Sequence, residues 1–343
     1  MAPAVFRVAL YALMGTGLYL LWGTMALNGS LQLMLEVSET GIFPNGRVMK
    51  TSYTGLALVD RLVSILVAFF DGLNNLVDIA PYLMLLDLVG TLLVINMMTL
   101  VEHRRSPRLG LSPTIWQYLW NCAGVAVFFP IYVLNYIDKG PNKSRPLSSL
   151  EAQALPFTAI WSLFLALPLM IPALLGASPF QVQKGVIAFF LLIPCLSAFQ
   201  SMVRGTMTRT GYSVATRPVQ LAYSIVGGVS ALIHVGIILY VSIYATPSLS
   251  LSRVFIPHPG SIQLVQPDIL TEAALLFIQY DYIVIHAVVA LLVIHTALKI
   301  ISSRSLKLLL TTTAVTGGLG PGAGLAFVLY SIENQEDAQM KRK

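Results

Sequence analysis

Apolar stretches of about 20 residues recur along the whole chain, and short polar loops separate them. A stretch of that length can cross the hydrocarbon core of a bilayer as a helix. We place spans at residues 4–27, 79–100, 113–137, 154–176, 184–203, 218–245, 273–298 and 306–332, with 56–77 as a possible ninth. The pattern predicts an all-α integral membrane protein, a multi-span helical bundle with eight or nine membrane segments.

The composition supports the same class. Of the 343 residues, 56% are hydrophobic and 10% are charged, with a mean hydropathy of +0.76, whereas a soluble domain carries about 25% charged residues. The first apolar run is longer than a signal-peptide core, so we expect it to remain as a span. We therefore expect one helical transmembrane domain over residues 1–343, with a polar loop at 28–55, an acidic helix at 56–78 and a polar tail at 333–343.

The formal charge of +6 comes from short basic loops, so it bears on membrane topology, and we expect no nucleic-acid partner. Three loops on one side carry most of it: Lys139, Lys143 and Arg145; Arg204, Arg209 and Arg217; Lys299, Arg304 and Lys307. The positive-inside rule favours the cytoplasm for that side. A further cluster, Arg104, Arg105 and Arg108, would fall on the opposite side and argues against this orientation.

Small and kinking residues interrupt several spans. Prolines at positions 130, 168, 172 and 194 predict broken helices. Membranes tolerate such breaks where neighbouring helices or a polar cavity satisfy the freed carbonyls. The glycine-rich stretch 317–324 predicts close packing between helices.

Three aspartates fall on one side of the expected helix at 56–78. Asp71 and Asp78 follow Asp60 by 11 and 18 positions, which is close to whole turns at about 100° per residue. Two interpretations fit this stripe. The carboxylates line a cavity inside the bundle, or an interfacial helix holds them in water.

An ionised carboxylate is costly inside a membrane span. It is tolerated when it faces water, pairs with a cation or is protonated, and a protonated carboxyl in an apolar site is a competent proton donor. Our candidate catalytic residues are, in order, Asp60, Asp281, Asp71, Asp87 and Glu102.

Aromatic residues are plentiful in the spans, and rings around a protonated carboxyl would suit carbocation chemistry. Our candidate substrate-binding residues are Tyr53, Phe69, Trp116, Tyr280, Tyr282 and His286. For His234, His286 and His295 we expect interhelical hydrogen bonds. No histidine pair has the i, i+3 or i, i+4 spacing of metal ligands, and there is no Cys-x-x-Cys, so we expect neither a metal nor a cofactor.

Several short motifs together resemble those of a known family. They are Asn45-Gly46-Arg47, Thr51-Ser-Tyr-Thr-Gly55-x4-Asp60-x2-Val63-x3-Val67-Ala-Phe-Phe70-x-Gly72, Glu102-His-Arg-Arg105 and Gln279-Tyr280-Asp281-Tyr282. With these motifs the chain resembles, over most of its length, fungal membrane-integral meroterpenoid cyclases of the ascofuranone/ascochlorin and macrophorin pathway type.

The resemblance implies a membrane-bound terpene cyclase, of the isomerase or lyase class, that cyclises a farnesyl chain on an aromatic or quinone-type head. A general acid would start the reaction by protonating a terminal epoxide or alkene, without a metal. The resemblance also implies a lipophilic prenylated substrate that enters from membrane lipid, a role in fungal secondary metabolism and a location in the endoplasmic reticulum.

Two other classes of protein stay open. Intramembrane carboxylates also mark proton-coupled secondary transporters, here an exporter of a lipophilic metabolite. No repeat between the two halves of the chain is visible, and such a repeat is common in transporter folds. Carboxylates that only pair helices would suit a non-catalytic scaffold or receptor.

Overall fold

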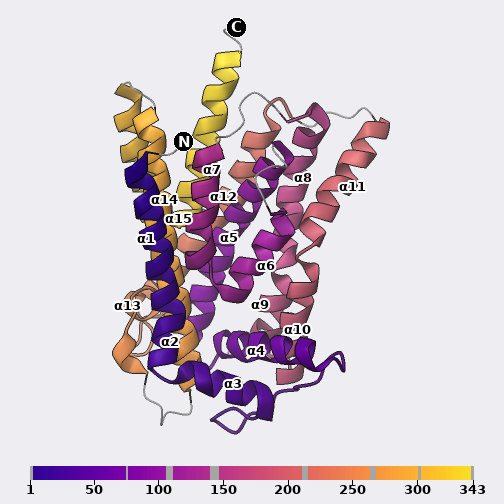
Figure 1. The fold of residues 1–343 in the computed structure, drawn as a ribbon, viewed down its shortest axis with the longest axis vertical. Helices are drawn as coiled ribbons and strands as arrows, with labels where there is room; N and C mark the ends of the chain where they lie inside the picture. The colour runs from indigo at the N-terminus through magenta and orange to yellow at the C-terminus, as the bar shows by residue number, and fades with distance from the viewer. Residues whose placement is uncertain are drawn as a thin grey trace.

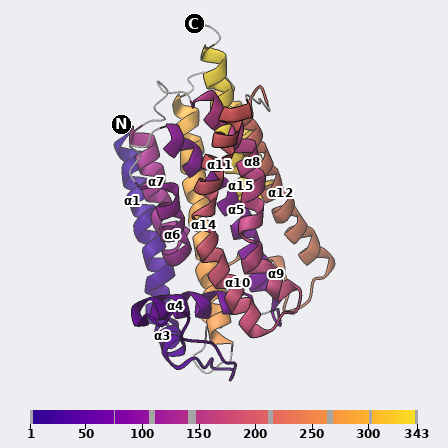
Figure 2. The ribbon, with the colours of Figure 1, turned by 90° about the vertical axis from the view of Figure 1, so that its right-hand side faces the viewer.

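The chain folds into a helical bundle that is capped at one end, as seen in a computed structural model that describes residues 3–74, 76–105, 111–139, 147–210, 215–262, 268–299 and 303–340. The long helices run side by side, while α3 and α4 lie across the lower end (Figure 1). Both chain ends lie toward the upper end (Figure 2). The described residues hold two isolated β-bridges, Ile42↔Val48 and Thr246↔Leu249, and no longer strand.

The helices alternate with short connections. The first half of the chain forms α1 (Ala4–Leu18), the π-helical η1 (Tyr19–Gly23), α2 (Thr24–Leu27), α3 (Ser30–Thr40), α4 (Ala57–Leu73), α5 (Ile79–Arg105), α6 (Pro113–Ala123) and α7 (Val125–Lys139). The second half forms α8 (Ser149–Leu165), α9 (Leu167–Leu174), α10 (Pro179–Leu192), α11 (Cys195–Thr210), α12 (Pro218–Ile243), α13 (Leu251–Phe255), the 3-10 turn η2 (Pro259–Ser261), α14 (Ile269–Lys299) and α15 (Ser303–Met340).

The predicted class is confirmed, because several helices are long and apolar enough to cross a bilayer. Within the described residues there are six such segments: Ala4–Leu27, Ile79–Arg105, Ser149–Leu174, Pro218–Ile243, Ile269–Leu298 and Leu306–Asn334. The pair Pro179–Leu192 and Cys195–Thr208, bent by 50° around Pro194, would make a seventh. The chain is a helical membrane protein, and the expected eight or nine segments are too many.

The predicted span 113–137 is an antiparallel helical hairpin. Gly124 breaks it with a φ of +101° between α6 and α7. The Trp116 ring of α6 lies 5.4 Å from the Tyr132 ring of α7, at equal distances in sequence from the break. Both arms therefore return toward the same end of the bundle, where Asp138 pairs with Arg7 at 2.8 Å.

A second reversal occurs inside α15, at Gly320, whose φ is +88°. A Cβ on Gly324 would lie 1.9 Å from the Thr316 hydroxyl oxygen, although eight residues along a straight helix span about 12 Å. The two halves of α15 therefore pack side by side, so Leu306–Asn334, although long and apolar enough to span, turns back inside the bundle. The expected tail at 333–343 continues the second half as helix to Met340. The final residues, 341–343, lie outside the described residues.

The glycine-rich stretch packs as expected. A Cβ on Gly322 would lie 2.3 Å from the Ser230 hydroxyl oxygen, and one on Gly227 would lie 2.5 Å from the Ala326 side chain. Only glycine lets α12 and α15 approach this closely, which confirms the prediction of close helix packing.

The segment 28–78 differs from its prediction at two points. Residues 30–40, expected to be loop, form α3, which buries Met34 and Val37 on one face. Helix α4 ends at Leu73, so Asp78 does not extend the acidic stripe; it pairs with Arg253 at 2.6 Å. This helix was not predicted because the polar residues between its apolar positions obscure the helical repeat in the sequence.

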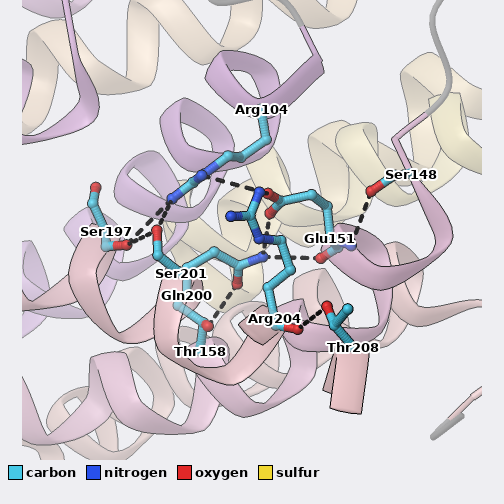
Figure 3. A network of polar contacts seen from close by, with 9 residues as sticks. All are labelled: Arg104, Ser148, Glu151, Thr158, Ser197, Gln200, Ser201, Arg204 and Thr208. Atoms are coloured by element: carbon cyan, nitrogen blue, oxygen red, sulfur yellow. Dashed lines mark hydrogen bonds and ion pairs between the residues drawn. The ribbon is translucent and has the colours of Figure 1, made fainter. Parts of the chain in front are cut away.

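The basic residues expected on opposite sides meet at one end. Arg104 of α5 and Arg204 of α11 both reach Glu151 of α8, at 3.4 and 2.8 Å, and Gln200 completes the network (Figure 3). The opposite placement of the Arg104 cluster was wrong because the hairpin at 113–139 does not cross the bundle. The positive-inside rule then favours the cytoplasm for the end that holds both termini. Arg108, Lys143 and Arg145 lie outside the described residues.

Candidate active site

A cavity lies between α4 and the interior of the bundle, with an empty volume of about 680 Å³ including its open side. The apolar face of α4 covers it through Ile65, Leu66, Phe69 and Phe70. Its other walls come mainly from apolar and aromatic side chains: Trp22, Met25, Met34, Leu85, Leu88, Val89, Leu92, Trp120, Cys122, Val125, Leu169, Phe189, Phe277 and Ile278. Such a cavity fits an apolar ligand.

Among the described residues that line this cavity, Asp281 is the only one with an ionisable carboxyl. It is 2% exposed. Its two oxygens accept backbone N–H groups of Val125, at 3.1 Å, and Ala126, at 2.5 Å. These are the first residues of α7, so the free N–H groups and the positive end of the helix dipole point at the carboxyl.

The break at Gly124 makes this arrangement possible. Gly124 has a φ of +101°, and a Cβ there would lie 2.3 Å from the Leu21 side chain. The indole N–H of Trp22 donates to the Ala123 carbonyl at 2.8 Å, which satisfies an acceptor that the end of α6 leaves free. Non-helical backbone inside a membrane domain needs such partners or a cavity.

Aromatic rings stand beside Asp281. The Phe277 ring lies edge-on to Trp22, at 5.4 Å, and to Phe69, at 5.1 Å. These three rings come from α14, η1 and α4, so separate parts of the chain converge on one wall of the cavity. Phe69 and Asp281 are the two predicted site residues that line it.

Asp60, the first candidate acid, lies elsewhere. Its carboxylate accepts five hydrogen bonds from the preceding loop, donated by the Ser52 and Thr54 hydroxyls and by the backbone N–H groups of Tyr53, Thr54 and Gly55. These bonds, chiefly that from the Thr54 backbone, lower the pKa of Asp60. The carboxylate therefore stays ionised and holds the loop against α4.

Asp71 is also turned away from the cavity. It is 1% exposed and pairs with Arg47 at 2.9 Å. Burial raises its pKa, while the Arg47 charge opposes that shift. The stripe thus matches neither interpretation fully. α4 lies across the end of the bundle like an interfacial helix, but its carboxylates are buried against residues 47–55.

Asp87 forms a second buried cluster. Its Oδ2 accepts the Tyr282 hydroxyl at 2.7 Å and lies 2.7 Å from His234 Nδ1. The expected interhelical bond of His234 is therefore confirmed. His286 instead lies 3.0 Å from the Tyr282 carbonyl one turn earlier on its own helix, and the His295 ring packs edge-on against Phe6.

The remaining candidates are spread over the bundle. Glu102 pairs with Arg105 at 3.1 Å, near the basic end. Trp116 stacks on Trp120, behind the cavity wall. Tyr280 lines a separate outer groove with Tyr19 and Pro259.

Tyr53 lies in the loop that Asp60 holds, where burial raises its pKa to about 12. Among the described residues, no group of three or more His, Cys, Asp or Glu side chains is placed to hold a metal ion. The absence of a metal cofactor stays a prediction.

Sequence reasoning did not select Gly124, Trp22 or Trp120 for the site. A glycine inside an apolar run carries no signal that distinguishes a helix break from ordinary packing. The aromatic residues were visible as a group, but their spacing along separate segments does not reveal which rings meet.

Comparison with known proteins places the chain among fungal proteins of one family. The family model of the CtvD domain matches residues 6–334. The chain is 26% identical to terpene cyclase DEP1 of Fusarium langsethiae, over 94% of this chain and 97% of that protein. It is 25% identical to terpene cyclase DEP1 of Alternaria brassicicola, over 97% and 100% of the two chains.

A third relative, terpene cyclase alnG of Emericella nidulans, is 25% identical over 92% of this chain and 90% of its own length. No solved structure matches the chain. The resemblance found in the sequence is confirmed, because all three relatives are fungal proteins that carry the name terpene cyclase. Since the domain model covers nearly all of its length, this chain belongs to the CtvD-domain family.

Proposed function

We propose that this protein is a membrane-bound terpene cyclase that performs acid-initiated cyclisation of a farnesylated aromatic or quinone-type substrate in meroterpenoid biosynthesis. One observation carries the proposal: a buried carboxyl, Asp281, faces an aromatic-lined cavity inside the membrane domain. The names of its relatives support the same class.

Asp281 is the proton donor in this proposal. Its carboxyl transfers a proton to a terminal epoxide oxygen or alkene carbon, and an internal alkene of the same chain attacks the cationic centre. The final ring cation loses a proton to the Asp281 carboxylate, which restores the acid. Substrate and product are therefore isomers, and the mechanism needs neither metal nor cofactor.

The start of α7 assists this transfer. As Asp281 loses its proton, negative charge develops on oxygens that already accept the Val125 and Ala126 N–H groups. Preorganised donors stabilise developing charge most strongly in a site that excludes water. The N–H groups lie at the correct atoms before the reaction begins.

The cavity walls complete the mechanism. The faces and edges of Trp22, Phe69 and Phe277 surround the space beside the carboxyl, and a ring face stabilises a nearby cation by about 0.5–2 kcal/mol. The apolar lining keeps water from intercepting the cation. A lipophilic prenylated substrate would enter from the bilayer, and by analogy we place the protein in the endoplasmic reticulum.

Purified protein in liposomes tests the proposal. Wild type should convert an epoxyfarnesyl phenol or its unepoxidised parent into a product of unchanged mass, detected by chromatography with mass spectrometry. Asp281→Asn should abolish this product, while Asp87→Asn, a buried carboxylate outside the cavity, should retain it.

Two other results would count against a cyclase. Folded wild-type protein that forms no isomer from either substrate contradicts the reaction. Proton-coupled flux of the substrate without a new product would instead support the transporter.

A further inference from the structure

A second cavity adjoins the first, deeper in the bundle between α5, α6, α8, α10 and α11. Its empty volume is about 470 Å³, including its open side. Both cavities are lined by Val89, Leu92, Asn121 and Phe189. Along α5 the lining extends from Leu85 to Asn96, or about 16 Å at 1.5 Å per residue. One elongated ligand can therefore lie against both cavities.

The two cavities differ in polarity. Asp281 and Asn121 are the polar side chains in the lining of the first cavity. The lining of the second includes Asn96, Gln117, Asn121 and Ser162. An elongated ligand that fits both would be apolar at one end and polar at the other.

Two amide atoms of the second cavity have no partner among the described residues. Gln117 is 2% exposed, and its Nε2 is buried without an acceptor. The Oδ1 of Asn96 is buried without a donor. By contrast, Asn121 donates to the Gln117 backbone carbonyl at 2.7 Å, and Ser162 donates to the Ala159 carbonyl at 2.7 Å.

An unsatisfied buried amide costs about 1–3 kcal/mol, so it is rarely retained without a partner. Here one free donor and one free acceptor line the same cavity. A ligand group that both accepts and donates a hydrogen bond would satisfy both of them. A hydroxyl does this with a single oxygen.

We propose that the second cavity binds the hydroxylated head of the substrate, with Gln117 Nε2 donating to the head oxygen and Asn96 Oδ1 accepting its proton. The isoprenoid chain then extends into the first cavity, where its far end meets Asp281. This inference rests on the proposed function and narrows the substrate class to amphiphiles with a phenol or alcohol head.

Binding to the Asp281→Asn protein tests the head site without requiring chemistry. The probes are an epoxyfarnesyl phenol and the matching epoxyfarnesyl benzene, which lacks the hydroxyl. We expect the phenol to bind about tenfold more tightly, as one or two net hydrogen bonds provide. Gln117→Met or Asn96→Leu in the same background should reduce the ratio to about one.

Thr91→Val is the matched control, because the Thr91 hydroxyl is also buried on α5 without a partner but lines neither cavity. It should leave the tenfold ratio unchanged. Gln117→Met should not lower the unfolding temperature, since no intramolecular hydrogen bond is lost. A lower unfolding temperature with an unchanged ratio would assign Gln117 a structural role and overturn the proposal.

Equal binding of the two probes would place the head elsewhere and also overturn it. The head site and the reaction can fail separately. Preferential binding of the phenol, together with no turnover by wild type, would leave the head site standing and reject the cyclase.

Discussion

The chain reverses twice inside the bundle, at Gly124 and at Gly320, and both glycines have positive φ. At the first break, Asp281 accepts two N–H groups of α7 and faces a cavity. At the second, a Cβ on Gly320 would lie 2.9 Å from His234, which contacts Asp87. A glycine with positive φ reverses the chain at both breaks, but of the two nearby carboxyls only that of Asp281 lines the first cavity.

The difference between the two breaks lies in what surrounds the carboxyl. Asp87 is bonded to Tyr282 and His234 side chains, and Phe255 packs against both of those rings, at 6.0 and 5.6 Å. Asp281, by contrast, accepts hydrogen bonds from the backbone alone and lines the cavity. A buried carboxylate with side-chain partners stabilises the fold, whereas one held by backbone beside empty space suits chemistry.

Exchanging each carboxylate for an amide gives the largest expected contrast. Asp281→Asn should lower turnover about 1,000-fold, because it removes the proton donor. Asp87→Asn should instead lower stability by about 1–3 kcal/mol, as it weakens a buried hydrogen-bonded cluster. Turnover per folded molecule and thermal unfolding in detergent measure the two effects. Equal loss of turnover in both variants would contradict the distinction.

Alanine substitutions at Gly124 and Gly320 should give the second-largest contrast between the two breaks. An alanine at either position would have to adopt a positive φ with an extended ψ, which is essentially restricted to glycine and costs about 1–3 kcal/mol. Gly124→Ala should also lower turnover about 100-fold, since the shifted N–H groups no longer meet the Asp281 oxygens. Gly320→Ala should reduce the unfolding temperature without changing turnover per folded molecule. If Gly124→Ala kept full turnover, the break would not position the acid.

The indole hydrogen bond of Trp22 should have a smaller effect. Trp22→Phe keeps an aromatic ring in the cavity wall but removes the donor to the Ala123 carbonyl. We expect turnover to fall about tenfold, because one buried acceptor is left unsatisfied beside the break. Trp161→Phe is the control, since its buried indole N–H has no partner among the described residues and lines neither cavity.

Asp60 lies at neither break, and replacing its carboxylate should have the smallest effect, which is on stability alone. The pKa of Asp60 is lowered in the fold, chiefly by the Thr54 backbone N–H. Its contribution is therefore complete above the unfolded pKa of about 4 and is lost as the pH falls through the folded value. Wild type should unfold at a higher temperature than Asp60→Asn at pH 7, and the difference should narrow below about pH 4. A difference that grows in acid would have the wrong sign.

Sequence alone was enough to predict the class of protein and the close packing of helices at the glycine-rich stretch. Apolar runs of bilayer length, few charges and a stretch of small residues predicted a helical membrane protein with tightly packed helices, and these features are local. It also brought Asp281 into the set of candidates, because a carboxyl in an apolar span is rare whatever surrounds it. Phe69 entered the set as an aromatic residue that could bind the substrate.

Only the tertiary structure decided how many runs cross the bundle and which carboxyl faces the cavity. The reversals at Gly124 and Gly320 depend on contacts with Leu21 and His234, which lie far away in sequence. The sequence around each aspartate is similarly apolar, so it does not distinguish the roles of Asp60, Asp71, Asp87 and Asp281. Their roles follow from partners brought together by folding, such as the Val125 N–H, which is 156 residues from Asp281.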